Sequence, residues 1–384
     1  MFLVHVERRF DPFFRPAFDA LFRDSLTRLA TALINMKRQN EHFKLAEERP
    51  QPDEEAHLQD IITTMGNQMR RLWQAGDFQR AGNTKTHGIV RGEVTIREDI
   101  PEHMRRGIFA QPRTYKAWVR FSGPGPYITP DIDDVGFMSI SIKLMGVPGP
   151  KLLDDEKFTQ DMFGVSTPTF VTPDTKANSQ LQHWSYKNAQ TFYFINLMHP
   201  HVLDFIMQSL WIKTQSSPLE SEYFSCVPYL LGEGQAMQYS VLSRLKTRTR
   251  VPRLPLRPPD NYLRDAMAAT LARQDVEFDI LLQVQTDSYL MPIENNAVFW
   301  PLRLSPRVPA AVLRIPQQKF DSPEQLAFTK VLSYNPWHSI PEHRPLGNQS
   351  RARLRLYKEL STLRQTVNAV QHYEPNGDET FPSS

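Results

Sequence analysis

The spacing of hydrophobic residues changes along the chain, and this change restricts the fold more than any other feature. In residues 13–48 and 54–75, hydrophobic residues return every three or four positions, which predicts two helices. From residue 84 the period becomes two, which is typical of strands. Residues 350–370 are good helix formers without Gly or Pro, so they predict a further helix. Helices at the ends and strands in the centre indicate an α+β protein.

The centre of the chain contains the segments that read as strands. In residues 136–145, apolar and polar side chains alternate, as in a strand with two unlike faces. The other strand candidates are residues 84–96, 116–122, 163–172, 276–286 and 311–315. A helical middle at 190–216 and a Pro-rich connection at 251–260 separate the early candidates from the late ones. We therefore expect an antiparallel β-barrel, or a strongly curled sheet, with N-terminal and C-terminal helices.

Charge and cysteine content exclude several classes of protein. The 384-residue chain has a formal net charge of +3, so there is no electrostatic case for a nucleic-acid partner. Cys226 is the single cysteine, which excludes an intramolecular disulfide and a multi-cysteine metal site. No apolar run reaches the ~20 residues of a membrane-spanning helix, and charges in residues 1–9 interrupt the apolar core of a secretory signal. We expect a cytoplasmic protein, with membrane contact only at its periphery.

A stripe of unusual chemistry lies on the last predicted helix. At 3.6 residues per turn, Arg353 and Tyr357 lie one above the other and Arg364 returns to the same face. An Arg next to a phenol favours the charged phenolate. A tyrosinate is an anionic oxygen ligand suited to ferric iron, and Tyr is a known axial ligand of haem. The spacing alone favours the other interpretation, an amphipathic surface helix whose Arg and Tyr pair only with one another.

The stripe resembles the haem-ligating helix of catalases, in which one Arg precedes the ligand Tyr by four residues and another follows it by seven. The resemblance implies that Tyr357 is the metal ligand of haem b, that Arg353 keeps it ionised and that Arg364 binds a haem propionate. The preceding residues 334–338 and 341–347 look like the run into that helix in the compact catalase-related branch, which contains small catalase-like peroxidases.

A second part of the resemblance surrounds His87. The sequence Thr86-His87-Gly88 is similar to coral allene oxide synthase, a catalase relative acting on fatty-acid hydroperoxides, in which Thr precedes the distal His. A neutral imidazole can take the proton of a hydroperoxide and return it to the leaving oxygen, and the Thr86 hydroxyl would hold the ring. The alternative is a hydrogen-bonded structural histidine. The string ending in Ser122 matches Val-Arg-Phe-Ser of the family, which implies Arg120 at a propionate and Ser122 near His87.

Departures from the family concern the pocket for peroxide. Catalases carry Gly-Asn-Asn-Thr-Pro where this chain has residues 164–168, and Val165 replaces the first Asn. Val has no hydrogen-bonding group to hold a peroxide. Thr84 stands where catalases have another propionate Arg, whereas Phe170 matches an aromatic residue of the distal wall. These differences predict a retained haem site with poor dismutation of hydrogen peroxide.

The resemblance divides the chain into three parts. Residues 81–375 form the expected haem-binding domain, residues 1–80 a helical extension packed on it, and residues 376–384 a tail. We keep a single domain across the Pro-rich connection, because the haem hypothesis needs His87 and Tyr357 on opposite sides of one cofactor.

The leading functional hypothesis is a haem enzyme that acts on organic hydroperoxides, chiefly those of fatty acids, by peroxidation or by rearrangement or cleavage of the O–O bond. The first alternative is a small peroxidase or weak catalase that removes hydrogen peroxide. The second is a non-catalytic haem or lipid carrier, against which the proton-shuttling His87 argues.

The first predicted helix is rich in phenylalanine. Its aromatic residues are Phe10, Phe13, Phe14, Phe18 and Phe22. Core packing is the ordinary explanation of such a stripe, and the alternative is an apolar lip that touches a membrane or admits a lipid. The expected partners are therefore a lipid hydroperoxide substrate and, through the N-terminal helix, a membrane surface. Assembly into a homo-oligomer stays open.

Overall fold

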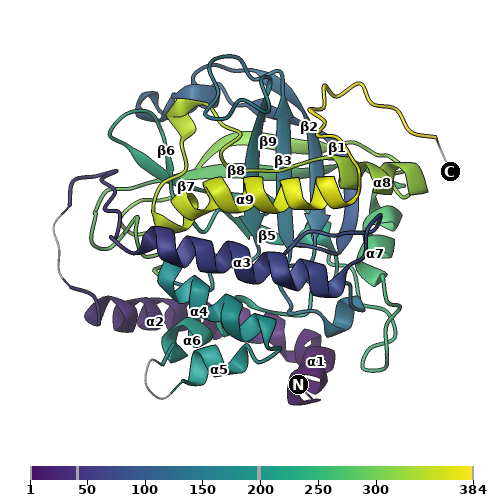
Figure 1. Cartoon of the computed structure of the whole chain (residues 1–384), viewed down its shortest axis with the longest axis horizontal. Helices are drawn as coiled ribbons and strands as arrows, with labels where there is room; N and C mark the ends of the chain where they lie inside the picture. Colours follow the sequence, from purple (N-terminus) through teal and green to yellow (C-terminus); the bar gives the residue numbers. More distant parts are fainter. Residues whose placement is uncertain (1, 40–42, 197–199, 383–384) are drawn as a thin grey trace.

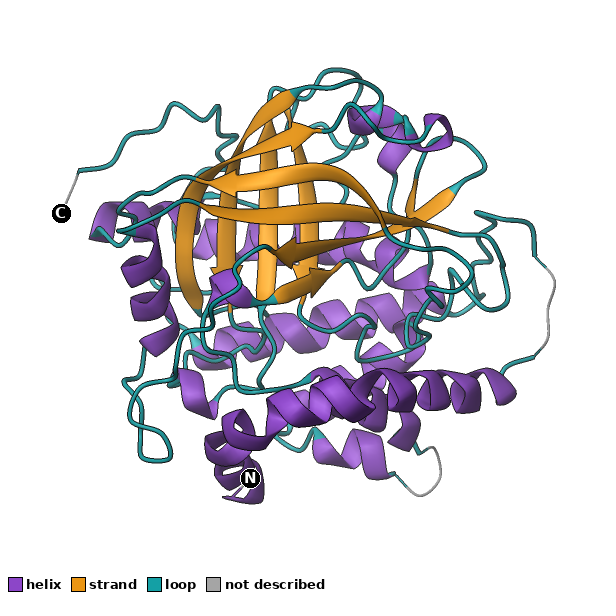
Figure 2. Cartoon of the chain, turned by 180° about the vertical axis from the view of Figure 1, so that it is seen from behind, coloured by secondary structure: helices purple, strands orange, loops and turns teal. Residues whose placement is uncertain are grey.

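The computed structural model describes residues 2–39, 43–196 and 200–382, and it consists of a β-barrel with helices packed around it (Figures 1 and 2). The strands are β1 (Thr86–Ile96), β2 (Thr114–Ser122), β3 (Ser139–Met145), β4 (Thr159–Val165), β5 (Glu222–Phe224), β6 (Tyr229–Leu230), β7 (Ala236–Ser243), β8 (Val276–Val284) and β9 (Val308–Ile315). Their order is β5-β4-β3-β2-β1-β9-β8-β7-β6, and β5 also pairs with β7. This last pairing closes the sheet, so eight antiparallel strands form a ring and β6 extends from β7.

The helices lie at the ends of the chain and between β4 and β8. They are α1 (Phe2–Phe18), a π-helix η1 (Asp19–Arg23), α2 (Asp24–Met36), α3 (Glu54–Leu72), α4 (Thr175–Tyr186), α5 (Thr191–Ile195), α6 (Val202–Trp211), α7 (Tyr262–Leu271), α8 (Pro323–Val331) and α9 (Asn348–Val367). The predicted α+β class, with an antiparallel barrel and terminal helices, is confirmed.

Several predicted boundaries are wrong. The strand predicted at 163–172 ends at Val165, because Pro168 has no N–H with which to continue a ladder. The predicted helix 13–48 begins earlier and ends at Met36, and its residues 40–42 lie outside the described residues. The helical middle contains α5 and α6, while its residues 197–199 lie outside the described residues.

The alternation in β3 does not separate a buried face from a solvent-exposed one, because both of its faces are buried. Ile140, Ile142 and Leu144 point into the barrel, where they join the main hydrophobic core. The polar residues between them point to the outer face, yet all seven residues of β3 are buried. Connecting segments as well as helices therefore cover the outer face of this part of the barrel, and polar side chains there are enclosed.

Helices α9 and α3 form the cover over this outer face and lie side by side (Figure 1). Leu58 and Ile61 of α3 pack against Leu356 and Leu360 of α9. Polar contacts at the start of α9 also fix it: Arg351 forms ion pairs with Glu48, Glu54 and Glu294 at 2.8, 2.6 and 2.9 Å. The predicted division into an extension, a haem-binding domain and a tail stays a prediction. No helix of the described ranges has the length and apolar character to cross a membrane.

Candidate functional site

The outer face of β1 to β4 presents two rows of side chains to α9. Strand pairing aligns Thr86, Ser122, Ser139 and Val165 in one row across the four strands. The next row consists of Ile89, Arg120, Ser141 and Phe163. Small and apolar side chains therefore make a shallow floor, with one buried guanidinium, directly beneath the helix that crosses it in Figure 1.

Helix α9 directs its predicted site residues to the sheet and its surroundings. Gly347 has φ 85°, a conformation that favours glycine, and the helix begins at the next residue. The Tyr357 ring meets Phe163 of β4 edge-on, with ring centroids 5.9 Å apart. The Arg353 guanidinium lies 5.1 Å from the centroid of the Phe170 ring. Tyr357 thus lies over the floor, and Arg353 and Phe170 are brought together.

Arg120 is the centre of a hydrogen-bond network on the floor. Its side chain is 2% exposed. Nη2 and Nε donate to Thr86 Oγ1 at 2.8 and 3.1 Å, Nη1 donates to Ser122 Oγ at 3.0 Å, and Nη2 also donates to the Asn83 carbonyl at 2.6 Å. The hydroxyls of Thr86 and Ser122, which the sequence assigned to His87, are therefore oriented by Arg120.

Two further guanidinium groups lie next to Arg120. Arg80 Nη2 donates to the carbonyls of Thr329 and Leu332 at 2.7 and 2.9 Å. Arg364, 3% exposed, donates to the same Leu332 carbonyl at 3.1 Å. Burial lowers the pKa of Arg120, and the charges of Arg80 and Arg364 lower it further. Burial also lowers the pKa of Arg80 to about 10. The three cations are therefore close enough to repel one another.

These three arginines have only neutral partners. Among the residues that the structure describes, none of the three forms a salt bridge with a carboxylate. The carbonyl end of α8 offsets part of the charge of Arg80 and Arg364, but Arg120 has no helix end beside it. The hydroxyl of buried Tyr334, which interacts electrostatically with Arg120 and Arg80, also lacks a hydrogen-bond partner. Buried charges are normally paired, so this arrangement indicates a site for an anion.

Arg80 was not among the predicted site residues. In the resemblance to catalases, a propionate-binding Arg stands three positions before the distal His, and this chain has Thr84 there. The structure shows that Thr84 Oγ1 donates to the Arg80 carbonyl at 2.9 Å, in a segment that precedes β1 and belongs to no strand. An arginine from an irregular segment cannot be located by counting residues. A signal was present in the sequence, however, because Arg80 is the nearest arginine before His87.

His87 lies at an irregularity of β1. The register shifts between Thr86 and Gly88, so His87 is left without a partner on β2. Neither ring nitrogen has a hydrogen-bond partner, and Nδ1 lies 3.6 Å from Asp131 Oδ1. Asp131 belongs to the short 3₁₀ helix η4 (Asp131–Asp133) and is held by the Lys85 ammonium at 2.7 Å. Burial, with the charges of Lys85, Arg264 and Arg120, holds the pKa of His87 well below its usual range, so the ring is neutral.

The structure thus gathers Arg120, Thr86, Ser122 and Arg364 into one region. Val165 lies in the same row as Ser122, and Tyr357 contacts Phe163 in the neighbouring row. Among the described residues, no hydrogen bond or ring contact joins His87 to Tyr357. The two central residues of the predicted site therefore come from different layers: His87 from the barrel and Tyr357 from α9.

Solved structures that are similar to this one include three catalases. A fungal catalase matches with a TM-score of 0.59 and 14% sequence identity, covering 85% of this chain and 66% of that chain. A bacterial catalase gives 0.57 and 16%, covering 87% and 65%. Catalase A from Saccharomyces cerevisiae gives 0.60 and 15%, covering 88% and 72%. No protein-family model and no curated protein matches the sequence.

These similarities show a catalase-like fold, and they point to no narrower branch such as the allene oxide synthases. The chain spans slightly less than two thirds of the fungal and bacterial catalases. The activity of those longer proteins comes to this chain only as a proposal.

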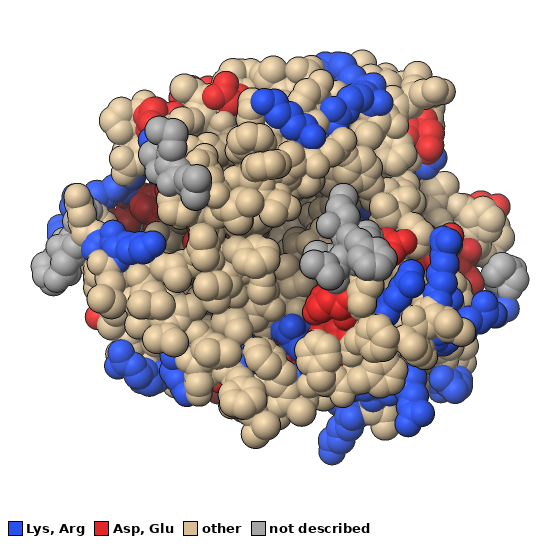
Figure 3. Space-filling model, turned by 90° about the horizontal axis from the view of Figure 1, so that it is seen from below, with Lys and Arg blue, Asp and Glu red and all other residues tan. Residues whose placement is uncertain are grey.

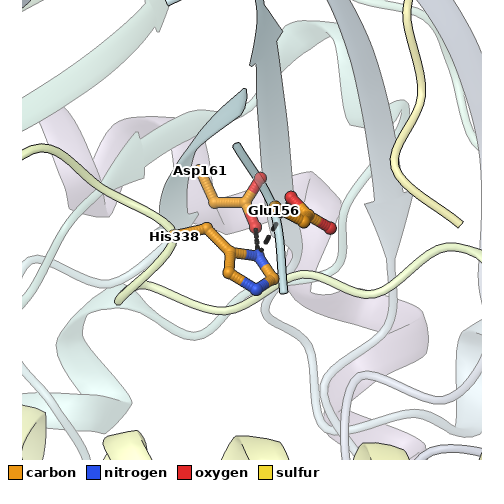
Figure 4. A group of neighbouring side chains, drawn as sticks. All are labelled: Glu156, Asp161 and His338. Atoms are coloured by element: carbon orange, nitrogen blue, oxygen red, sulfur yellow. Dashed lines mark hydrogen bonds and ion pairs between the residues drawn. The ribbon is translucent and has the colours of Figure 1, made fainter. Parts of the chain in front are cut away.

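A second cluster of titratable groups lies farther along the same outer face, and it has the composition of a metal site. Glu156, Asp161 and His338 are buried and direct their ligand atoms toward one another (Figure 4). The Lys143 ammonium, however, contacts both carboxylates and lies 2.8 Å from Asp161 Oδ1. His338 Nδ1 lies 2.9 Å from Asp161 Oδ2.

Charge balance favours an ion cluster over a metal site. Burial and the charge of Lys143 lower the pKa of His338, but hydrogen bonds with Asp155 and Asp161 outweigh them and raise it to about 9. Burial raises the pKa of Glu156, but the charges of Lys143 and His338 and the hydrogen bonds from His372 and Lys143 together outweigh burial, and the pKa falls to about 2. Two cations therefore face two carboxylates at neutral pH, and the ammonium takes the place that a metal ion would need.

We predict that Lys143→Met strongly destabilises the fold. The substitution leaves two carboxylates buried without their main counter-ion, which costs about 3–5 kcal/mol for a buried pair. Denaturant unfolding measures the change. Lys116→Met is the matched control, because its ion pair with Asp378 is largely exposed and contributes at most ~1 kcal/mol. Equal stability of the two variants would contradict this account of the cluster.

Proposed function

We propose that this chain is a haem-dependent enzyme that acts on organic hydroperoxides, chiefly those of fatty acids. It does so by peroxidation or by rearrangement or cleavage of the O–O bond. The observation that carries the proposal is the group of Arg80, Arg120 and Arg364, three guanidiniums without carboxylate partners under α9. Haem b is a flat apolar ring with two carboxylates, and these carboxylates would supply the counter-charge for the three arginines.

The residues present fit such a group. The three arginines would hold the propionates, since a guanidinium pairs well with a carboxylate. Tyr357 would be the iron ligand from α9, with Arg353 one turn before it. The floor offers Val165 and Phe163 to the flat apolar ring. When bound, haem supplies the redox-active iron that activates a peroxide.

His87 supplies the acid–base chemistry of the proposal. Its neutral ring has free nitrogen atoms, so it can take the proton of a hydroperoxide on one nitrogen and return it to the leaving oxygen. Asp131 lies on the Nδ1 side of the ring, which leaves Nε2 for this exchange. A haem or lipid carrier would have no use for a neutral histidine buried in this way.

The apolar residues near α9 favour a substrate with an alkyl chain. Val165 offers no hydrogen bond on the floor, and Phe163 and Phe170 add apolar surface near α9. Such a wall suits an alkyl chain, whereas hydrogen peroxide depends on polar groups to be held. Removal of hydrogen peroxide is the second candidate function, and the catalase-like fold is the observation that favours it.

We predict that Tyr357→Phe abolishes or strongly reduces haem retention, because it removes the one anionic oxygen proposed for the iron. Haem content of the purified protein, measured by its Soret absorption and by a pyridine haemochrome assay, tests this. The control is Tyr373→Phe, whose hydroxyl bonds Glu379 at the surface. A Tyr357→Phe variant with the native band and haem content would refute the ligand assignment.

We predict that His87→Ala keeps haem and loses most hydroperoxide turnover. A positioned acid–base group typically contributes ~100- to 10,000-fold to a rate. Stopped-flow turnover of a fatty-acid hydroperoxide, normalised to haem content, measures the loss. The exposed His103 provides the matched control, His103→Ala. Turnover equal to that of the native protein would show that His87 is structural.

We predict that Val165→Asn improves activity toward hydrogen peroxide and changes little with fatty-acid hydroperoxides. A restored hydrogen bond to a reacting group contributes ~1.5–3 kcal/mol, or roughly 10- to 150-fold in rate. Thr86 is left intact because Arg120 donates two hydrogen bonds to it. Val165→Leu is the control, and an oxygen electrode is the measurement. Oxygen evolution by the native protein at the rate of a true catalase would instead support hydrogen peroxide as the substrate.

A further inference from the structure

The N-terminal helices carry an exposed apolar stripe along their outer side. Helices α1, η1 and α2 follow one another without a break from Phe2 to Met36. Phe13 is 67% exposed, Leu21 69% and Met36 80%. The stripe also contains Phe10, Phe14, Phe22, Leu26, Leu29 and Leu33, all of them exposed. Core packing, the ordinary explanation of this phenylalanine-rich segment, therefore does not apply to most of these side chains.

The opposite side of the same helices is fixed to the body of the protein. Asp11 Oδ2 accepts a hydrogen bond from the Thr214 amide at 2.6 Å. Arg15 donates to the Leu210 carbonyl, and Ala30 and Ile34 pack in one core cluster with residues of α6. The orientation of the helices is thus set by buried contacts, and these contacts turn the apolar stripe outward.

A basic loop lies beside this stripe. Residues 244–257 contain six Lys or Arg residues and neither Asp nor Glu. Lys246, Arg248, Arg250 and Arg253 are exposed, and Leu256, in the same loop, is 73% exposed. Among the described residues, these four cations have no hydrogen-bonded or ion-paired carboxylate. A free cluster of like charges on one loop is a surface for an anionic partner.

The loop and the stripe share one face of the molecule. Lys213 forms an ion pair with Asp19 of η1 at 3.4 Å, and the charges of both Arg248 and Arg23 act on it. In Figures 1 and 2 the loop descends to the same lower edge as α1 and α2. Figure 3, which views this underside, shows a broad surface of mostly uncharged residues, with Lys and Arg side chains along much of its rim and a smaller group of Asp and Glu side chains within it.

We propose that this face docks on an anionic lipid surface. An amphipathic helix with aromatic and aliphatic residues on its outer side inserts that side at the boundary between headgroups and acyl chains. Cations next to it are attracted to anionic headgroups, and stable attachment generally needs two such signals together. The stripe supplies the first signal and the loop supplies the second.

The free cations favour a membrane over a second copy of the chain. In a symmetric dimer the same face meets itself, so two basic loops would lie at one interface and their like charges would oppose its formation. An anionic bilayer instead neutralises them all. The docking is independent of the proposed haem chemistry, since it involves no residue of that site.

The test is sedimentation of the full-length protein with vesicles, which needs no catalytic readout. We expect binding to vesicles of phosphatidylcholine with phosphatidylserine and much weaker binding to phosphatidylcholine alone. Arg248→Glu with Arg250→Glu should weaken the partitioning by roughly 30-fold or more, since each cation near an anionic surface contributes about five-fold. Phe13→Ser with Leu29→Ser should also abolish sedimentation.

Matched controls lie away from this face. Phe158→Ser changes an apolar residue that is 66% exposed, and Lys157→Glu reverses the neighbouring charge. The backbone amides of both residues bond Glu374, in the C-terminal segment. The controls should sediment like the native protein. Absence of sedimentation, equal binding to both vesicle types, or a dimer in light scattering that Phe13→Ser with Leu29→Ser dissociates would overturn the proposal.

Discussion

Repulsion among three buried guanidinium groups is the constraint on which the proposed site depends. The N–H groups of Arg80, Arg120 and Arg364 donate hydrogen bonds to carbonyl and hydroxyl oxygens, but no carboxylate among the described residues balances their positive charges. The ion cluster around Lys143 shows the contrast within the same protein, because there two carboxylates balance two cations. Because the fold neutralises one set of buried charges and leaves the other without counter-ions, we propose that a bound dianion balances the second set.

The three arginines come from three layers of the structure. Arg80 precedes β1, Arg120 lies in β2, and Arg364 lies in α9 near the carbonyl end of α8. The site therefore forms only when α9 is seated on the barrel, and the ion pairs of Arg351 and the packing of α3 hold it there. A ligand that bridges these layers would stabilise the folded state by mass action, because it binds only the assembled arrangement. Under the proposed function, folding and cofactor binding would therefore be coupled.

The sequence predicts the elements whose pattern is local. The alternation in 136–145 and the helix periodicity around Tyr357 require only neighbouring residues, and both segments have the predicted secondary structure. The sequence points to Arg80 only as the nearest arginine before His87, and its position beside Arg120 could not be predicted because it depends on an irregular segment and on the end of α8. The register shift at His87 and the two- and three-residue strands β6 and β5 are also set by tertiary contacts. The burial of the polar residues of β3 likewise depends on tertiary contacts, which the local alternation does not reveal.

The proposed pocket and the proposed docking face are both apolar, although they consist of different residues. Both would help the protein to reach a substrate that is scarce in water. A fatty-acid hydroperoxide that crosses water exposes its chain at about 0.8 kcal/mol per methylene, so nearly all of it stays in the bilayer. An enzyme free in water meets only the small dissolved fraction. An enzyme held at the lipid surface by α1, α2 and the 244–257 loop meets the substrate where it is concentrated. The apolar wall around Val165 is proposed to favour a substrate with a long apolar tail. Docking through the exposed stripe would raise the local concentration of that substrate at the enzyme.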